Sequence, residues 1–189
     1  MQSWKRINNG SVVKVHDAFT TRAFGDSSLI VVTDYFPRSK TLAEEHLKNA
    51  ASYNRGRPTT NHIPEATLWG YITQIASALK AIHSNGLAAR VINPSKVILT
   101  SKNRIRLNGC AVLDITQHDL PRPLPDLQAD DLTQLGQLIL SLANTKNSLE
   151  AVGRTYSLQL KECITWLLMP PSSPSLPQSP GGASVTNIP

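Results

Sequence analysis

Residues that commonly do chemistry are scattered along this sequence, and their spacing matches few known sites. Histidine or cysteine stands at positions 16, 46, 62, 83, 110, 118 and 163. These positions lack the HxxxH or CxxC spacing of a zinc site, and no GxSxG motif indicates a hydrolytic nucleophile. Two cysteines are too few for a disulfide framework, so we expect Cys110 and Cys163 to be small, buried apolar residues. No metal site is predicted.

One stretch has the outline of a catalytic loop, but its reactive residues are replaced. Residues 88–99 read AARVINPSKVIL, which resembles the protein-kinase loop HRDLKPENILL. Val91 stands where a kinase has the Asp that orients the substrate hydroxyl. Asn93 replaces the Lys that contacts the transferred phosphate, and Lys96 replaces the metal-binding Asn. Gly109 takes the place of the metal-binding Asp of the DFG motif. The sequence therefore predicts a kinase frame without catalytic residues.

The elements that would position this loop are also predicted. Apolar residues at helical spacing indicate a long helix, and short apolar runs separated by polar residues indicate strands. The expected elements are strands near 12–19 and 29–35, a helix over 64–84, a β-hairpin formed by 97–99 and 105–107, and helices near 130–143 and 157–168.

Asp131 begins the sequence DLTQLG, which resembles a kinase helix that opens with DxWSLG. In kinases the Asp of that helix holds the backbone of the catalytic loop, and we expect the same of Asp131. Only about twenty residues separate Ala111 from Asp131, too few for an ordinary activation and substrate-docking segment. His83, at the end of the long helix, matches a structural kinase histidine, and Arg90 keeps the Arg of the HRD motif. We expect both to serve structure.

The predicted fold class is α+β and protein-kinase-like, consisting mostly of the helical C-lobe with a partial N-lobe sheet. Residues 1–36 would form partial N-lobe strands and the hinge, and residues 37–169 the C-lobe. Residues 170–189 are rich in Pro, Ser and Gly, which predicts a disordered tail. The N-terminal sheet would leave an edge and an apolar face uncovered, which predicts low solubility.

A more specific resemblance rests on residues 17–42, DAFTTRAFGDSSLIVVTDYFPRSKTL, and on residues 68–99, LWGYITQIASALKAIHSNGLAARVINPSKVIL. These segments resemble the pseudokinase domain of the regulatory subunit of the poly(A)-specific deadenylase complex. The resemblance implies ATP binding without phosphotransfer. It also implies partners: a catalytic exonuclease recruited by a C-terminal knob, poly(A)-binding protein contacted by an N-terminal tail, and a second copy joined through a coiled coil. The implied role is to bring the nuclease to messenger RNA tails.

The resemblance also implies a nucleotide site. The adenine edge would bind hinge backbone along Asp34, Tyr35, Phe36, Pro37, Arg38, Ser39, Lys40 and Thr41. Ser95 and Lys96 match positions that approach the phosphates in this family. An ammonium at Lys96 can neutralise phosphate charge where a kinase uses magnesium. In the alternative interpretation, Ser95 begins a turn and Lys96 is merely exposed. No catalytic or metal-binding residue is predicted.

The net charge of +6 and the pI near 9.6 raise the question of RNA binding. Four basic residues around the hairpin could form a basic edge that attracts poly(A) RNA: Lys96, Lys102, Arg104 and Arg106. A solvated hairpin with charges that prevent aggregation is the plainer interpretation, because no aromatic residues are interleaved for base stacking.

Composition points to a cytoplasmic protein. The first ten residues, MQSWKRINNG, lack the apolar core of a signal peptide, and no run approaches the roughly eighteen apolar residues of a membrane span. The upstream strands of an N-lobe, the coiled coil and the knob are not in this sequence, so a fragment or a shortened gene product is expected. A non-functional or competing fragment and an unusual active kinase remain alternatives to the deadenylase scaffold.

Overall fold

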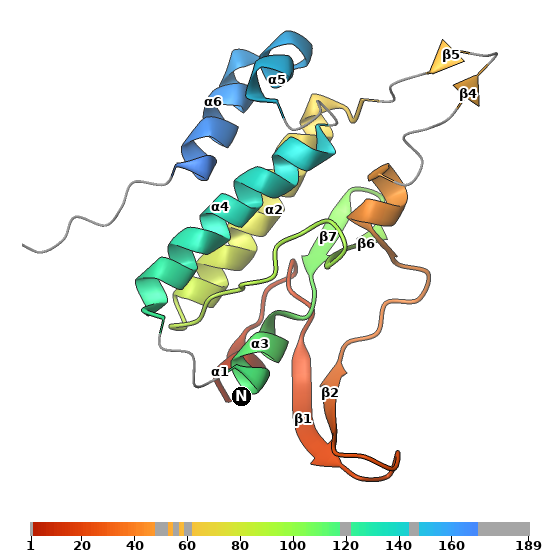
Figure 1. Cartoon of the computed structure of the whole chain (residues 1–189), viewed down its shortest axis with the longest axis vertical. Helices are drawn as coiled ribbons and strands as arrows, with labels where there is room; N and C mark the ends of the chain where they lie inside the picture. Colours follow the sequence, from red (N-terminus) through yellow and green to blue (C-terminus); the bar gives the residue numbers. More distant parts are fainter. Residues whose placement is uncertain are drawn as a thin grey trace, which may run out of the picture.

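The computed structural model describes residues 2–47, 53–54, 57–58, 62–117, 122–143 and 148–169. Figure 1 shows a layer of helices with a three-stranded sheet on one side and a separate two-stranded hairpin beyond it. The tail predicted at 170–189 lies outside the described residues. None of the helices in the described part of the chain is long and apolar enough to cross a membrane.

The helical layer is built on α2 (Glu65–His83) and α4 (Leu124–Leu142), which lie side by side (Figure 1). The helix predicted over 64–84 is confirmed, and its apolar stripe is buried. The start of α4 was predicted too late, near residue 130. Its N-cap is Pro123, and Pro125 lies in the first turn, where proline is tolerated because those N–H groups have no partner within the helix.

Two further helices follow α4 in the chain, and the second of them packs against α4. The predicted helix at 157–168 is confirmed as α6 (Leu158–Leu168), whereas α5 (Leu149–Thr155) was not predicted. A Cβ on Gly136 would come within 3.0 Å of the Leu167 Cβ, so glycine allows α4 and α6 to approach closely. The α6 helix thereby helps to hold α4, the helix that carries Asp131, and α5 in turn packs against α6.

The predicted β-hairpin is present as β6 (Val97–Ser101) and β7 (Arg104–Leu107), and β3 (Lys40–Thr41) adds a third antiparallel strand beside β6. One face of this sheet is buried, because Val97, Ile105 and Leu107 have at most 1% of their surface exposed. Residues alternate between faces in a strand. Ile98 and its cross-strand partner Arg106 therefore lie on the opposite face.

The predicted N-terminal strands are confirmed as β1 (Val15–Thr21) and β2 (Ser28–Thr33), paired antiparallel. An isolated parallel bridge between Val12 and Leu107 connects the chain before β1 to the three-stranded sheet. The hairpin leaves apolar surface uncovered, as expected, since Phe19 is 50% and Phe24 72% exposed. The short strands β4 (Tyr53–Asn54) and β5 (Arg57–Pro58) form a separate pair.

Besides α5, three further short helices were not predicted: α1 (Gln2–Arg6), the π-helix η1 (Ala43–Leu47) and α3 (Cys110–Thr116). The segment that aligns with the DFG motif thus opens a helix. Cys110 is buried as expected, and this burial raises the pKa of its thiol to about 12. Cys163 is only partly buried, although it packs against the core and burial raises its pKa as well.

Candidate functional site

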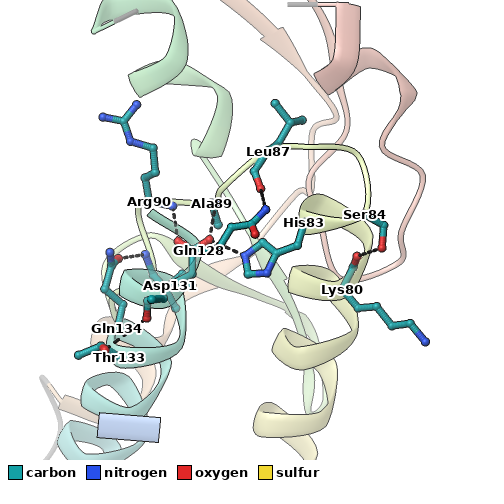
Figure 2. Close-up of polar contacts among 12 residues, drawn as sticks. Lys80, His83, Ser84, Leu87, Ala89, Arg90, Gln128, Asp131, Thr133 and Gln134 are labelled. Atoms are coloured by element: carbon teal, nitrogen blue, oxygen red, sulfur yellow. Dashed lines mark hydrogen bonds and ion pairs between the residues drawn. The ribbon is translucent and has the colours of Figure 1, made fainter. Parts of the chain in front are cut away.

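The loop that resembles a kinase catalytic loop is held by one buried carboxylate (Figure 2). Asp131 on α4 has no exposed surface. Its Oδ2 accepts hydrogen bonds from the Ala89 amide at 2.7 Å and from His83 Nε2 at 2.8 Å, and its Oδ1 accepts one from the Arg90 amide at 2.7 Å. Charge-assisted bonds of this length are strong. The predicted structural roles of Asp131 and His83 are confirmed.

The same helix binds the loop at two further points. The Gln134 side chain accepts a hydrogen bond from the Ile92 amide at 2.8 Å, and Gln128 donates to the Leu87 carbonyl at 3.0 Å. Arg90 has a φ of 64°, a left-handed conformation that a non-glycine residue keeps only where its surroundings enforce it. The bonds from α4 on both sides of Arg90 provide that enforcement, so the loop has one fixed shape.

The positions that carry catalysis in a kinase hold other chemistry here. Val91 packs against the hydrophobic core. Gly109 has a φ of 78° and caps the N-terminus of α3, and a Cβ at this position would meet open space. The described residues contain no group of three or more His, Cys, Asp or Glu that could hold a metal ion. The fixed loop thus presents no base at residue 91, and the start of α3 presents no carboxylate at residue 109.

The two residues predicted to approach phosphates lie at the exposed end of the loop. The Asn93 Oδ1 accepts hydrogen bonds from the Ser95 amide at 3.1 Å and from the Ser95 hydroxyl at 2.7 Å. These bonds close a turn, so the hydroxyl proton of Ser95 already has an acceptor. Lys96 is exposed, and within the described part of the chain its ammonium has no hydrogen-bond or ion-pair partner. Of the two, Lys96 is the free donor.

The predicted hinge begins with a contact between a histidine and a carboxylate and then makes a tight turn. His16 Nε2 lies 2.7 Å from Asp34 Oδ1, and Tyr35 is 85% exposed. The Ser39 amide donates to the Phe36 carbonyl at 3.3 Å. Pro37 and a left-handed Arg38, with a φ of 59°, occupy the two central positions, as in a type II turn. The turn reverses the chain so that it can enter β3.

The end of the hinge is attached to the three-stranded sheet. Lys40 and Thr41 pair with Leu99 and Ile98 of β6, and the Ala43 amide donates to the Pro94 carbonyl at 2.9 Å. Lys40 also forms an exposed ion pair with Glu45 at 3.2 Å. Backbone contacts thus bring the hinge beside the loop that carries Ser95 and Lys96. No hydrogen bond between the described residues joins those two side chains directly to residues 34–41.

Arg106 connects the outer face of the sheet to the hinge, a role that the sequence did not reveal. Its guanidinium carbon lies 4.5 Å from the centre of the Phe36 ring, and its Nη1 lies 3.5 Å from the Val12 carbonyl oxygen. The first contact has cation–π geometry. The Nε atom is buried and has no hydrogen-bond partner among the residues that the structure describes. Strand alternation relative to buried Ile105 and Leu107 was the signal that could have placed Arg106 on this face.

The expected basic edge stays a prediction, but its four residues have different surroundings. Arg106 is turned onto Phe36, while Lys102 borders a cavity of about 450 Å³ that is also lined by His46 and His62. Arg104 lies so close to Gly10 that a Cβ there would come within 3.0 Å of its Nη2. The basic residues therefore face different neighbours. A second cavity of about 420 Å³ separates residues 92–94 from α4, and neither cavity is lined by the hinge.

Comparison with known proteins identifies the family. The protein named PAN2-PAN3 deadenylation complex subunit PAN3 from Phaeosphaeria nodorum is 56% identical over 201 residues, which cover 99% of this chain and 30% of the relative. The protein of the same name from Coccidioides immitis is 59% identical over 176 residues, 89% of this chain and 27% of the relative. This chain belongs to the PAN3 pseudokinase family.

Solved structures agree with this assignment. The Neurospora crassa PAN3 pseudokinase matches with a TM-score of 0.79 and 41% identity, over 89% of this chain and 43% of that chain. PAN3 in a complex of Neurospora crassa PAN2 (WD40-CS1) with PAN3 (pseudokinase and C-term) matches with a TM-score of 0.78. The predicted kinase-like fold is confirmed. No family model matches the chain, and the chain spans about 30% of the length of the curated relatives it matches.

Proposed function

We propose that this chain is a nucleotide-binding pseudokinase module that binds ATP without transferring its phosphate. The observation that carries the proposal is the free ammonium of Lys96 at the end of a loop fixed by Asp131. A cation carried on a preorganised loop stabilises phosphate charge without the entropic cost of ordering the loop backbone. The hinge backbone at residues 34–41 would bind the adenine edge, and Ser95 and Lys96 would bind the phosphates.

The absence of phosphotransfer follows from the residues at two positions. Phosphoryl transfer depends on positioning the nucleophile and on neutralising charge with metal ions. Val91 and Gly109 have no carboxylate for either task. An unusual active kinase is therefore the weaker alternative, and a radiolabel-transfer assay with magnesium and manganese tests it. Transfer that disappears in K96A would overturn the pseudokinase assignment.

We further propose that the module works in a PAN2–PAN3-type complex in the cytoplasm, where it supports shortening of mRNA poly(A) tails. The relatives' shared name and the solved PAN2–PAN3 complex support this role. Its partners would be a PAN2-type exonuclease, poly(A)-binding protein, a second copy of the subunit and poly(A) RNA. A chain that competes for these partners without activating the nuclease is the alternative. Deadenylation assays with added chain separate the two, because only a competitor slows the complex.

ATP binding can be measured by isothermal titration calorimetry of the full chain. We expect K96A to weaken binding about tenfold or more, because a charge-assisted phosphate contact is lost. K102A is the matched control, since Lys102 lies at the opposite end of the hairpin strand and borders a cavity that neither Lys96 nor the hinge lines. Binding in K96A should also depend more strongly on magnesium. Equal affinity of wild type, K96A and K102A would refute the assigned role of Lys96.

A further inference from the structure

Arg90 has a side-chain partner that the loop itself does not provide. Its Nη1 lies 3.0 Å from Asp114 Oδ1, and its Nη2 donates to Gln117 Oε1 at 3.0 Å. Asp114 belongs to α3, and Gln117 follows that helix directly. Figure 2 shows the Arg90 side chain pointing away from Asp131, which binds the Arg90 backbone. The backbone and the side chain of this one residue are therefore held by two different helices.

Asp114 is itself fixed by a third segment. Its Oδ2 accepts a hydrogen bond from Trp4 Nε1 at 2.7 Å, and the Trp4 side chain on α1 is only 2% exposed. The Arg90 and Asp114 side chains are 14% and 29% exposed. A partly buried pair of this kind is screened less by solvent than a surface ion pair. Both carboxylate oxygens are used, so Asp114 connects α1, the loop and α3.

Nearby charges leave this pairing intact. A cavity of about 200 Å³ beside Arg90 is also bordered by Arg122 and Asp130. Arg122 Nη2 lies 2.7 Å from Asp130 Oδ2, so each arginine at this cavity has its own carboxylate. Asp114 is thus the acidic partner of Arg90.

Active kinases order their activation loop when phosphorylation creates a new partner for an arginine. Here a carboxylate in the chain supplies a permanent partner. We propose that Asp114 is a positioning residue that keeps residues 89–96 in the shape required for ligand binding, independently of phosphorylation. This inference rests on the proposed function only in assigning that ligand as a nucleotide. Asp114 acts through Arg90 and does not touch the ligand.

Hydrogen exchange of the Ala89, Arg90 and Ile92 amides tests the positioning role directly, because α4 side chains accept from all three. We expect these amides to exchange about tenfold faster or more in D114A, since a charge-assisted bond is lost. D114N keeps an oxygen acceptor and should give a smaller increase. ATP affinity should fall in the same order. D126N, which removes an exposed charge from α4, is the matched control.

Several outcomes decide the proposal. Faster loop exchange in D114A and D114N, with D126N unchanged, supports it even if no variant or wild type binds ATP, in which case only the nucleotide assignment fails. A lower melting temperature with unchanged exchange at these three amides and unchanged ATP affinity would overturn it, because Asp114 would then only stabilise the fold. If D114A does not fold, the comparison of D114N with D126N gives the answer.

Discussion

The loop at residues 87–96 and the β1–β2 hairpin differ in how strongly the rest of the molecule holds them. Three side chains of α4, Gln128, Asp131 and Gln134, bind the loop backbone. The hairpin instead exposes half or more of the surfaces of Phe19 and Phe24. Val91 stands where the aligned kinase loop has its Asp, but the bonds that fix the shape of the loop are present. A rigid loop without reactive groups is suited to binding, because rigidity lowers the entropic cost of holding a ligand.

Replacing Asp131 should lower the stability of the protein more than any other substitution proposed for these two regions. D131A leaves the Ala89 and Arg90 amides without their acceptor and His83 without its partner. We expect the free energy of unfolding to fall by about 3–5 kcal/mol, measured by urea denaturation. D126A on the same helix should cost less than about 1 kcal/mol, because that side chain is exposed. Similar losses in both variants would mean that Asp131 is not the main support of the loop.

The contact between α2 and α6 should give an effect of intermediate size. Here a half-buried carboxylate at the start of α2 accepts hydrogen bonds from the N-cap residue of α6. Glu65 accepts hydrogen bonds from the Ser157 hydroxyl, from the Ser157 amide at 2.9 Å and from Trp69 Nε1 at 3.1 Å. The Ser157 hydroxyl bond is the main cause that holds the pKa of Glu65 below its ordinary value of 4.5. The contact therefore contributes stability above pH 4.5, and this contribution is lost as the pH falls through the lowered pKa.

E65Q tests this pH dependence. We expect the melting temperature of wild type to fall more steeply than that of E65Q between neutral pH and about pH 3, because the glutamine has no proton to gain. Circular dichroism melts over that range provide the measurement. Parallel curves for the two proteins would show that Glu65 does not titrate differently in the folded state.

The hairpin should respond least to substitution. Phe24 is 72% exposed, so F24S should change the free energy of unfolding by less than about 0.5 kcal/mol. It should also raise solubility, because an exposed aromatic side chain is removed. Light scattering at matched concentrations measures this gain. V15A provides the contrast, since Val15 at the base of the hairpin is 7% exposed and its truncation should destabilise the fold. Strong destabilisation by F24S would mean that the hairpin tip is packed in solution.

Helices and strands were predicted correctly where the apolar periodicity was strong. They were missed where tertiary packing, and not local sequence, determines whether the element forms. The long apolar stripe of α2 and the two apolar runs of the β6–β7 hairpin were readable in the sequence. The short helices α1 and α3 were missed because each has fewer than eight residues, so neither is stable without tertiary contacts. The early start of α4 was missed because its prolines resemble a loop signal.

In the candidate site, too, some residues could be assigned from the sequence and others could not. Val91, Lys96 and Gly109 could be aligned with kinase positions from their spacing alone, and the role of Asp131 followed from its motif. Arg106 and Asp114 could not be assigned from spacing. The ring under Arg106 belongs to Phe36, 70 positions earlier, and the hydrogen bond to Asp114 comes from Trp4, 110 positions earlier. Sequence pattern carries no information on which distant side chains meet.

The sequence by itself determined the family, the kinase-like frame and the loss of the catalytic carboxylates, because these depend on residue type and local order. Only the tertiary structure decided which residues hold the Arg90 side chain and which of the charged side chains have partners. Ser95 and Lys96 are adjacent in the sequence, yet the Ser95 hydroxyl is bonded to Asn93 while Lys96 is exposed. Arg90 and Arg106 have the same charge, but one pairs with Asp114 and the other packs on Phe36. The difference arises because folding brings a different neighbour to each side chain.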